Sequence, residues 1–169
     1  MLSKDMVKAI NDQINKELYS AYYYLAMAAF FETENLDGMA QFMKVQAEEE
    51  VEHAMKFYNY VNDQGGHVEL ETIEKPKTDF KDAEEIFTLA LEHEKFVTSR
   101  IHALVDQALK ENDHATKAFL DWYVTEQVEE EATMDSILGK VKVLGKSGHG
   151  LFMLDAQLGQ RKSENESEE

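Results

Sequence analysis

The sequence predicts an all-α protein: a four-helix bundle with one long connection in its middle and a short fifth helix after it. Its 169 residues include a single proline, Pro76, and glycine is sparse before residue 145, so long helices can form. Apolar residues recur at helical spacing in four segments of about 25–30 residues each. We assign residues 1–162 to one domain, with the bundle in 3–144 and the fifth helix in 149–159.

The first two segments form a predicted helical hairpin. Residues 3–34 begin at Ser3, a residue type that caps helix N-termini well. The turn signal Asn35-Leu36-Asp37-Gly38 follows, and the next segment, residues 39–64, ends at Gly65-Gly66.

The third and fourth segments form a second hairpin, which a long connection joins to the first. Residues 66–81 make this connection, and roughly 16 extended residues span about 50 Å. A helix of ~28 residues is about 42 Å long, so the connection can run the full length of the bundle. Residues 82–111 and 114–144 then follow, with Asn112-Asp113 between them as a break and a cap.

The C-terminal part begins with the glycine-rich segment 145–150 and continues with a short apolar stretch, residues 151–158. This stretch is too short to stand alone, so its apolar side chains are expected between subunits or docked on the end of the bundle. Residues 163–169 contain four glutamates and are expected to be disordered.

Composition excludes several classes of function. The chain has 34 acidic and 17 basic residues and a net charge of −17, whereas nucleic-acid binding needs an excess of Lys and Arg. It has no cysteine, which excludes disulfides and thiolate-held metals. Its start does not resemble a signal peptide, and no uncharged apolar run approaches the ~18 residues of a membrane span. We therefore expect a cytoplasmic protein that binds neither nucleic acid nor membranes.

Polar side chains lie on the apolar faces of the four helices, where core residues are expected. There are six such side chains. At about 100° per residue along each helix, five lie within about 40° of that helix's stripe of large apolar residues, and the sixth lies toward the edge of its stripe. Equal distances from the two hairpin turns place them in one layer. They are Glu17, Glu50, His53, Glu94, Gln127 and Glu130. A shift of 77 residues also aligns 49–53 with 126–130 and Glu17 with Glu94, as in two related hairpins.

Burial of ionised carboxylates costs several kcal/mol each unless they are paired. The layer lacks obvious counter-charges, because the Lys and Arg residues that could reach it fall off the apolar stripes: Lys16, Lys44, Lys56, Lys95, Arg100 and Lys117. Bound metal is the favoured explanation, and a protonated or water-filled layer is the alternative. Glutamate oxygens with one imidazole suit iron or manganese better than copper, and Glu50 could bridge two ions. Glu131 also falls near the core face, and the sequence gives no role for it.

The motifs Glu17, Glu50-x-x-His53, Glu94 and Gln127-x-x-Glu130 resemble those of prokaryotic non-haem ferritins. The similarity extends over about residues 3–160. It implies a ferritin-like homo-oligomeric cage of 24 subunits that oxidises Fe(II) with dioxygen and stores Fe(III) as an oxyhydroxide mineral. By position, Glu17 and His53 would hold the first iron, Glu94 and Glu130 the second, and Glu50 would bridge them.

The resemblance implies roles for further residues. Gln127 would be a hydrogen-bond partner beside the second iron. Tyr24 would lie next to the di-iron centre, either as a packed residue with a satisfied hydroxyl or as an electron donor. A third iron site would share Glu130 and add Glu49, Glu126 and Glu129.

Departures from related families narrow the assignment. A haem-containing bacterioferritin would have Glu-x-x-His in place of Gln127-x-x-Glu130 and methionine in place of Val51, so no haem is expected. Rubrerythrins need cysteine, and the miniature DNA-protection proteins bind iron between subunits. With one histidine, the second iron site should be weak, so we expect a transit site that passes Fe(III) onward.

Two other functions stay open at this point: a di-iron or di-manganese oxidase with a separate substrate, and a structural bundle with a polar layer. Trp122 lies off the core stripe and is expected at a subunit contact. The histidines outside the layer are expected at the surface or in packing: His67, His93, His102, His114 and His149.

Overall fold

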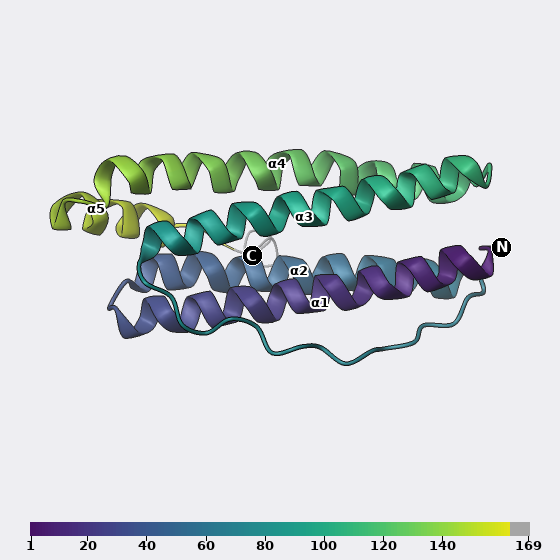
Figure 1. The fold of residues 1–169 in the computed structure, drawn as a ribbon, viewed down its shortest axis with the longest axis horizontal. Coiled ribbons are helices and arrows are strands. Elements are labelled where there is room, and N and C mark those ends of the chain that lie inside the picture. The colour runs from purple at the N-terminus through teal and green to yellow at the C-terminus, as the bar shows by residue number, and fades with distance from the viewer. Residues whose placement is uncertain (163–169) are drawn as a thin grey trace.

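The computed structural model describes residues 1–162, which contain five helices and no strand (Figure 1). The helices are α1 (Lys4–Thr33), α2 (Asp37–Asp63), α3 (Ala83–Lys110), α4 (His114–Leu144) and α5 (Gly148–Leu158). This architecture confirms the predicted all-α class, the long middle connection and the short fifth helix. The expectation of disorder for residues 163–169 lies outside the described residues.

Local capping fixes where most of the helices begin. Ser3 accepts a hydrogen bond from the backbone N–H of Met6 at 3.0 Å, as its residue type predicts. Asp113 accepts from the N–H of Thr116 at 3.0 Å and so starts α4. Asn112, just before it, has a φ of 56°, in the left-handed region where asparagine is tolerated.

α2 obtains its N-terminal cap from a distant helix. Leu36 provides no side-chain cap, and the Asp155 carboxylate of α5 accepts the Met39 N–H at 2.8 Å instead. A Cβ at Gly38 would lie 1.9 Å from the Asp155 carbonyl oxygen. Only glycine at this position allows α5 to approach α2 so closely.

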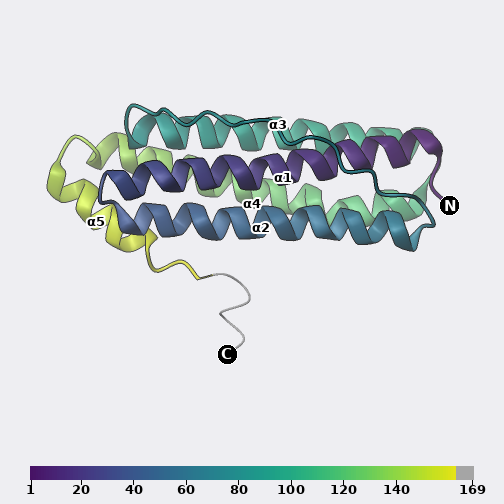
Figure 2. The same ribbon diagram turned by 90° about the horizontal axis from the view of Figure 1, so that it is seen from below.

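The connection between α2 and α3 runs along the length of the bundle (Figures 1 and 2). Two asparagines of α1 hold it in place. Asn11 donates to the His67 carbonyl at 2.9 Å, and Asn15 donates to the carbonyls of Glu71 and Thr72 at 3.3 and 3.2 Å. The connection therefore covers α1 and returns the chain to the end where α3 begins.

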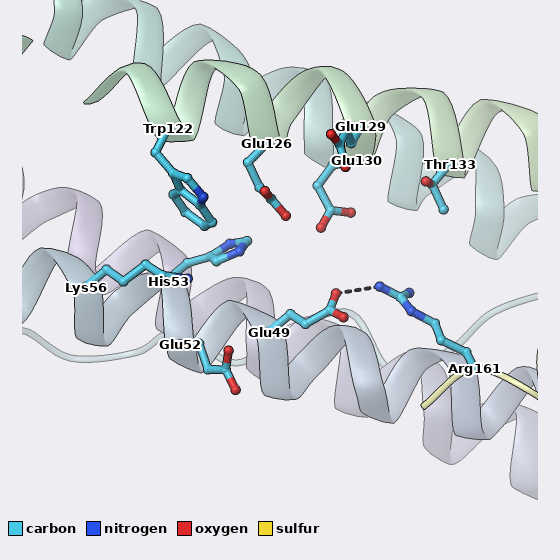
Figure 3. A pocket seen from close by; sticks show the side chains of 10 residues that line it. All are labelled: Glu49, Glu52, His53, Lys56, Trp122, Glu126, Glu129, Glu130, Thr133 and Arg161. Carbon is cyan, nitrogen blue, oxygen red and sulfur yellow. Dashed lines mark hydrogen bonds and ion pairs between the residues drawn. The ribbon is translucent and has the colours of Figure 1, made fainter. Parts of the chain in front are cut away.

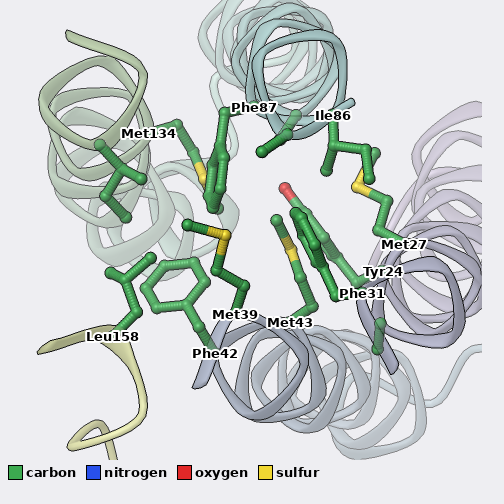
Figure 4. Close-up of a cluster of buried hydrophobic side chains, with 14 of the residues drawn as sticks. Tyr24, Met27, Phe31, Met39, Phe42, Met43, Ile86, Phe87, Met134 and Leu158 are labelled. Carbon is green, nitrogen blue, oxygen red and sulfur yellow. The ribbon is translucent and has the colours of Figure 1, made fainter. Parts of the chain in front are cut away.

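The apolar interior consists of two separate cores. The core nearer α5 includes Phe31 and Phe87 (Figure 4), and the other includes Phe57 and Ile101. Each long helix passes from one core to the other at the polar positions singled out in the sequence. These are Glu17 in α1, Glu50 and His53 in α2, Glu94 in α3, and Gln127 and Glu130 in α4.

α5 packs against α2 and α4 of its own bundle. Leu154 and Leu158 are buried there, whereas Phe152 and Met153 on the same helix are 68% and 60% exposed. Of the two arrangements expected for this helix, docking on the bundle is therefore observed for one face. The other face is uncovered in the subunit.

Candidate metal centre

Six polar side chains form one buried layer across the bundle, which we call the polar layer. Each is at most 5% exposed: Glu17, Glu50, His53, Glu94, Gln127 and Glu130. The structure thus brings together the residues that the helical wheel and the turn distances grouped. None of the Lys or Arg residues of the chain, all of which lie in 1–162, forms an ion pair with a carboxylate of this layer.

Three of these side chains form the first group of potential ligands. Glu17, Glu50 and His53 each offer a ligand atom within 4.8 Å of the other two. The His53 Nδ1 atom lies 3.6 Å from Glu50 Oε2. Glu17 Oε2 is buried and has no hydrogen-bond donor in the described structure. A buried carboxylate oxygen without a donor is costly, and a bound cation would satisfy it.

A chain of hydrogen bonds orients Glu17. Gln13 donates to Glu17 Oε1 at 2.8 Å and accepts from Arg100 Nε at 2.8 Å. Arg100 in turn forms an ion pair with Asp12 at 2.5 Å. The arginine therefore fixes the Gln13 amide and reaches the polar layer only through it, so its charge does not neutralise Glu17 directly.

Glu94 lies on the opposite side of the layer and accepts two side-chain hydrogen bonds. The Tyr24 hydroxyl donates to Glu94 Oε1, and Gln127 Nε2 donates to Glu94 Oε2 at 3.1 Å. Gln127 also donates to the Glu94 carbonyl at 3.2 Å. Gln127 thus lies beside Glu94 as a hydrogen-bond donor, and Tyr24 is fully buried with its hydroxyl satisfied.

The structure accounts for Glu131, whose role could not be inferred from the sequence. The Thr98 hydroxyl donates to Glu131 Oε1 at 2.6 Å and accepts from Gln127 Nε2 at 3.3 Å. Glu131 therefore anchors the threonine that helps to hold Gln127 in place beside Glu94. It is a supporting residue at the edge of the layer.

Burial dominates the protonation of the layer. It raises the pKa of Glu17 and Glu130 to about 8 and that of Glu94 to about 7. Neighbouring carboxylates act in the same direction, and burial together with Glu94 and Glu130 raises the pKa of Glu50 well above its ordinary value. Without a cation, much of the layer holds protons at neutral pH.

A cavity of about 200 Å³ lies between α2 and α4 and extends to the layer (Figure 3); we call it the outer pocket. His53, Glu126 and Glu130 form a second group of potential ligands there, with atoms within 4.8 Å of one another. Glu49 and Glu129 also line the pocket. The residues that the resemblance assigns to a third iron site therefore share one opening to the layer.

Two residues of the outer pocket make contacts within the subunit that the sequence did not indicate. Trp122 was expected at a subunit contact, which stays a prediction. Within the subunit its ring packs edge-on against His53, with ring centres 5.4 Å apart. The Lys56 ammonium lies 3.9 Å from the centre of the Trp122 ring. Arg161 follows α5 and forms an ion pair with Glu49. Helical periodicity cannot reveal either contact, because both join side chains from different elements.

His93, expected at the surface or in packing, is a packing residue. Its Nε2 lies 2.7 Å from the Ser20 hydroxyl, and its ring contacts those of Tyr23 and Tyr24. Burial lowers its pKa to about 4, so it is neutral at pH 7.

Comparison with known families and relatives gives consistent matches. A family model described as "Ferritin-like domain" matches residues 7–144. A bacterial non-heme ferritin from Campylobacter jejuni is 43% identical over 155 residues, which cover 92% of this chain and 93% of that protein. Another from Staphylococcus aureus is 40% identical over 166 residues and covers 98% of this chain and all of that protein.

Solved structures match equally well. One described as a novel open pore ferritin from the hyperthermophilic archaeon Archaeoglobus fulgidus has a TM-score of 0.95 and 44% identity, covering 96% of this chain and 100% of that chain. None of the described helices has the length and apolar character needed to cross a membrane.

Proposed function

The chain belongs to the ferritin family, in its prokaryotic non-haem branch, and from this premise we propose that it oxidises Fe(II) with dioxygen at the polar layer and stores Fe(III) as an oxyhydroxide mineral inside a multi-subunit cage. The observation that carries the proposal is the layer itself. It contains four buried carboxylates without a Lys or Arg partner, and one of their oxygens, Glu17 Oε2, has no donor. Burial of these groups in their charged form is costly, so without cations they hold protons, and bound cations would stabilise the charged form.

The donor set fits iron as the substrate. Oxygen ligands with a single imidazole suit Fe(II) and Fe(III). We assign Glu17 and His53 to a first iron ion and Glu94 and Glu130 to a second, with Glu50 between them. The short distances among Glu17, Glu50 and His53 support the first assignment. When two Fe(II) ions bind side by side, each can give an electron to the same dioxygen molecule.

The residues around the ligands position them and handle protons. Gln127 and Tyr24 donate to Glu94 and keep its carboxylate oriented toward the layer. Because burial raises the pKa of Glu17 and Glu130 to about 8, Fe(II) must displace protons from these groups at neutral pH. Metal binding should therefore release protons to the solvent through the outer pocket.

We infer that the second iron ion is held less tightly than the first. Its side of the layer has no imidazole of its own, and Gln127 supplies an amide N–H to Glu94 where a second histidine would supply a ligand. The centre then acts as a transit site that passes Fe(III) onward. A third iron ion would bind in the outer pocket at Glu49, Glu126, Glu129 and Glu130. A centre that kept the same two ions through many turnovers would contradict the transit role.

We propose a cytoplasmic cage of 24 subunits as the storage compartment. The exposed Phe152 and Met153 on α5 support association, because a cage contact would cover apolar surface that the subunit leaves open. Size-exclusion chromatography with light scattering would measure the subunit number directly. A monomer or dimer at all protein concentrations would contradict the cage.

Aerobic addition of excess Fe(II) tests the function. The wild-type chain should develop ferric absorbance and retain hundreds of iron atoms in a large soluble particle. Oxidation without retention would instead indicate an oxidase with another substrate, and absence of both would indicate a structural bundle.

Variants at the polar layer test the assignment of the site. E50A and H53A should slow the fast phase of oxidation by at least about tenfold, because each removes a ligand of the first ion. The cage should stay assembled. E48A removes an exposed carboxylate from the same helix and should oxidise Fe(II) as the wild type does. Unchanged kinetics in E50A and H53A would remove the assignment.

A further inference from the structure

The side chain of Arg161, three residues beyond the end of α5, lies across one face of α2. Its Nη1 donates to Gln46 Oε1 at 2.8 Å, and its Nη2 donates to Glu49 Oε2. Its guanidinium carbon lies 4.5 Å from the centre of the Phe42 ring. The three partners are spaced four and three residues apart and so lie on one face of the helix.

The contacts of Arg161 affect two carboxylates, and Glu49 is the first. This carboxylate lines the outer pocket, and its side chain is only 20% exposed. One of its oxygens is engaged by the guanidinium (Figure 3). A metal ion that binds Glu49 must compete with this ion pair, and the arginine charge also repels a cation that enters the pocket.

The second carboxylate is Glu130, which Arg161 affects through Gln46. Because the carbonyl oxygen of Gln46 accepts from Arg161, its Nε2 faces the other way and donates to Glu130 Oε2 at 2.8 Å. Arg161 thereby determines which end of the amide faces the metal ligands. One guanidinium influences two carboxylates at once, Glu49 directly and Glu130 through the amide.

We propose that Arg161 is an internal competing cation that weakens the third metal site of the outer pocket, so that an ion there is passed on rather than retained. The inference rests on the proposed function, because that function assigns Glu49, Glu126, Glu129 and Glu130 to a third ion. Arg161 is a positioning residue: it acts on metal through Glu49 and Gln46.

Lys56 provides a matched control. It also lines the outer pocket and carries one positive charge, but its ammonium lies over the Trp122 ring. K56Q and R161Q therefore remove the same charge from the same cavity. Only R161Q also removes the hydrogen bonds to Glu49 and Gln46.

Calorimetric titration of the metal-free full-length chain with Zn²⁺ measures the effect without turnover. The emission of Trp122, the only tryptophan, reports filling of the pocket in parallel. The wild type should bind two ions per subunit and a weaker third. R161Q should tighten the third step by about tenfold, the factor expected for the loss of a charge-assisted hydrogen bond. R161K, which keeps the charge without the paired donors, should lie between R161Q and the wild type.

Further variants separate the specific effect from general electrostatics. K56Q should change the third step by less than about threefold, and a gain equal to that of R161Q would overturn the proposal. In an E49Q background, most of the gain from R161Q should disappear, and an undiminished gain would overturn it as well. A wild-type chain that binds no Zn²⁺ would refute the proposed function too. Normal binding of two ions, with the same third step in wild type and R161Q, would refute only the role of Arg161.

Discussion

Glu94 illustrates at the residue scale how the chain keeps a buried carboxylate usable as a ligand. Burial raises its pKa to about 7, while hydrogen bonds from Tyr24 and Gln127 oppose that rise. Both donors favour the charged form, which is the form that binds a cation. The two neighbours therefore adjust how readily a metal displaces the Glu94 proton.

Replacing Tyr24 tests this balance. Y24F removes the hydroxyl donor, so the pKa of Glu94 should rise further and metal binding there should need a higher pH. Zn²⁺ titrations between pH 6 and 8 should show the second step about tenfold weaker than in the wild type at the lower pH, with the difference shrinking at the higher. Y22F alters an exposed tyrosine of the same helix that is not one of the assigned ligands, so this variant should match the wild type. A uniform loss at every pH would indicate a packing role for the hydroxyl instead.

Individual residues also show how far sequence reasoning reaches. Glu17, Glu50, Glu94 and Glu130 could be grouped because each belongs to a helix with a clear apolar stripe and a countable distance to its turn. The six-residue polar layer follows from that arithmetic. Arg161 and Trp122 could not be placed in the same way. Their contacts depend on the angle between α5 and the bundle and on the space between α2 and α4, which no local pattern encodes.

At the scale of elements, the docking of α5 determines how α2 begins. Asp155 caps the N-terminus of α2, and Gly38 leaves room for the α5 backbone. The sequence indicated a turn at Gly38 but not this close approach, because the two residues are 117 positions apart. A fifth helix with few buried residues thus contributes a hydrogen bond that α2 cannot supply from its own sequence.

G38A should undock α5. The added methyl would clash with the backbone carbonyl group of Asp155, which can move away only if α5 moves with it. Amide hydrogen exchange in α5 should quicken by at least about tenfold, while the centres of the long helices keep their protection. G139A is the matched control: its Cβ would meet nothing within 4 Å, and alanine is the better helix former. Equal exchange in α5 of G38A and wild type would contradict this role for the glycine.

At the scale of the whole molecule, the polar layer links stability to pH. The raised pKa values of Glu17 and Glu130, about 8, mean that these two carboxyl groups hold more protons in the folded chain than in the unfolded chain between about pH 4.5 and 8. The contribution of these groups to stability is complete below their unfolded pKa and is lost as the pH rises through their folded pKa. The metal-free protein should therefore lose stability toward alkaline pH.

Thermal unfolding of the metal-free protein checks this prediction. The Tm should fall between pH 5.5 and 8.5, and Zn²⁺ should raise it most at the alkaline end, where ligands bind metal without proton competition. E17Q has one titrating group fewer in the layer, so its Tm should fall less steeply. A Tm that rises over this range in the wild type would contradict the assigned pKa shifts.

The division of the interior into two apolar cores has a consequence for cooperativity. All four long helices run through both cores, yet apolar contact between the cores is interrupted at the polar layer. Without metal, each half of the bundle is a potential folding unit of its own, joined to the other by continuous backbone and by hydrogen bonds within the layer, such as those of Tyr24 to Glu94 and Gln46 to Glu130. Ions bound by ligands from all four helices would join the halves, so the cargo that the protein handles would also make its two halves melt as one.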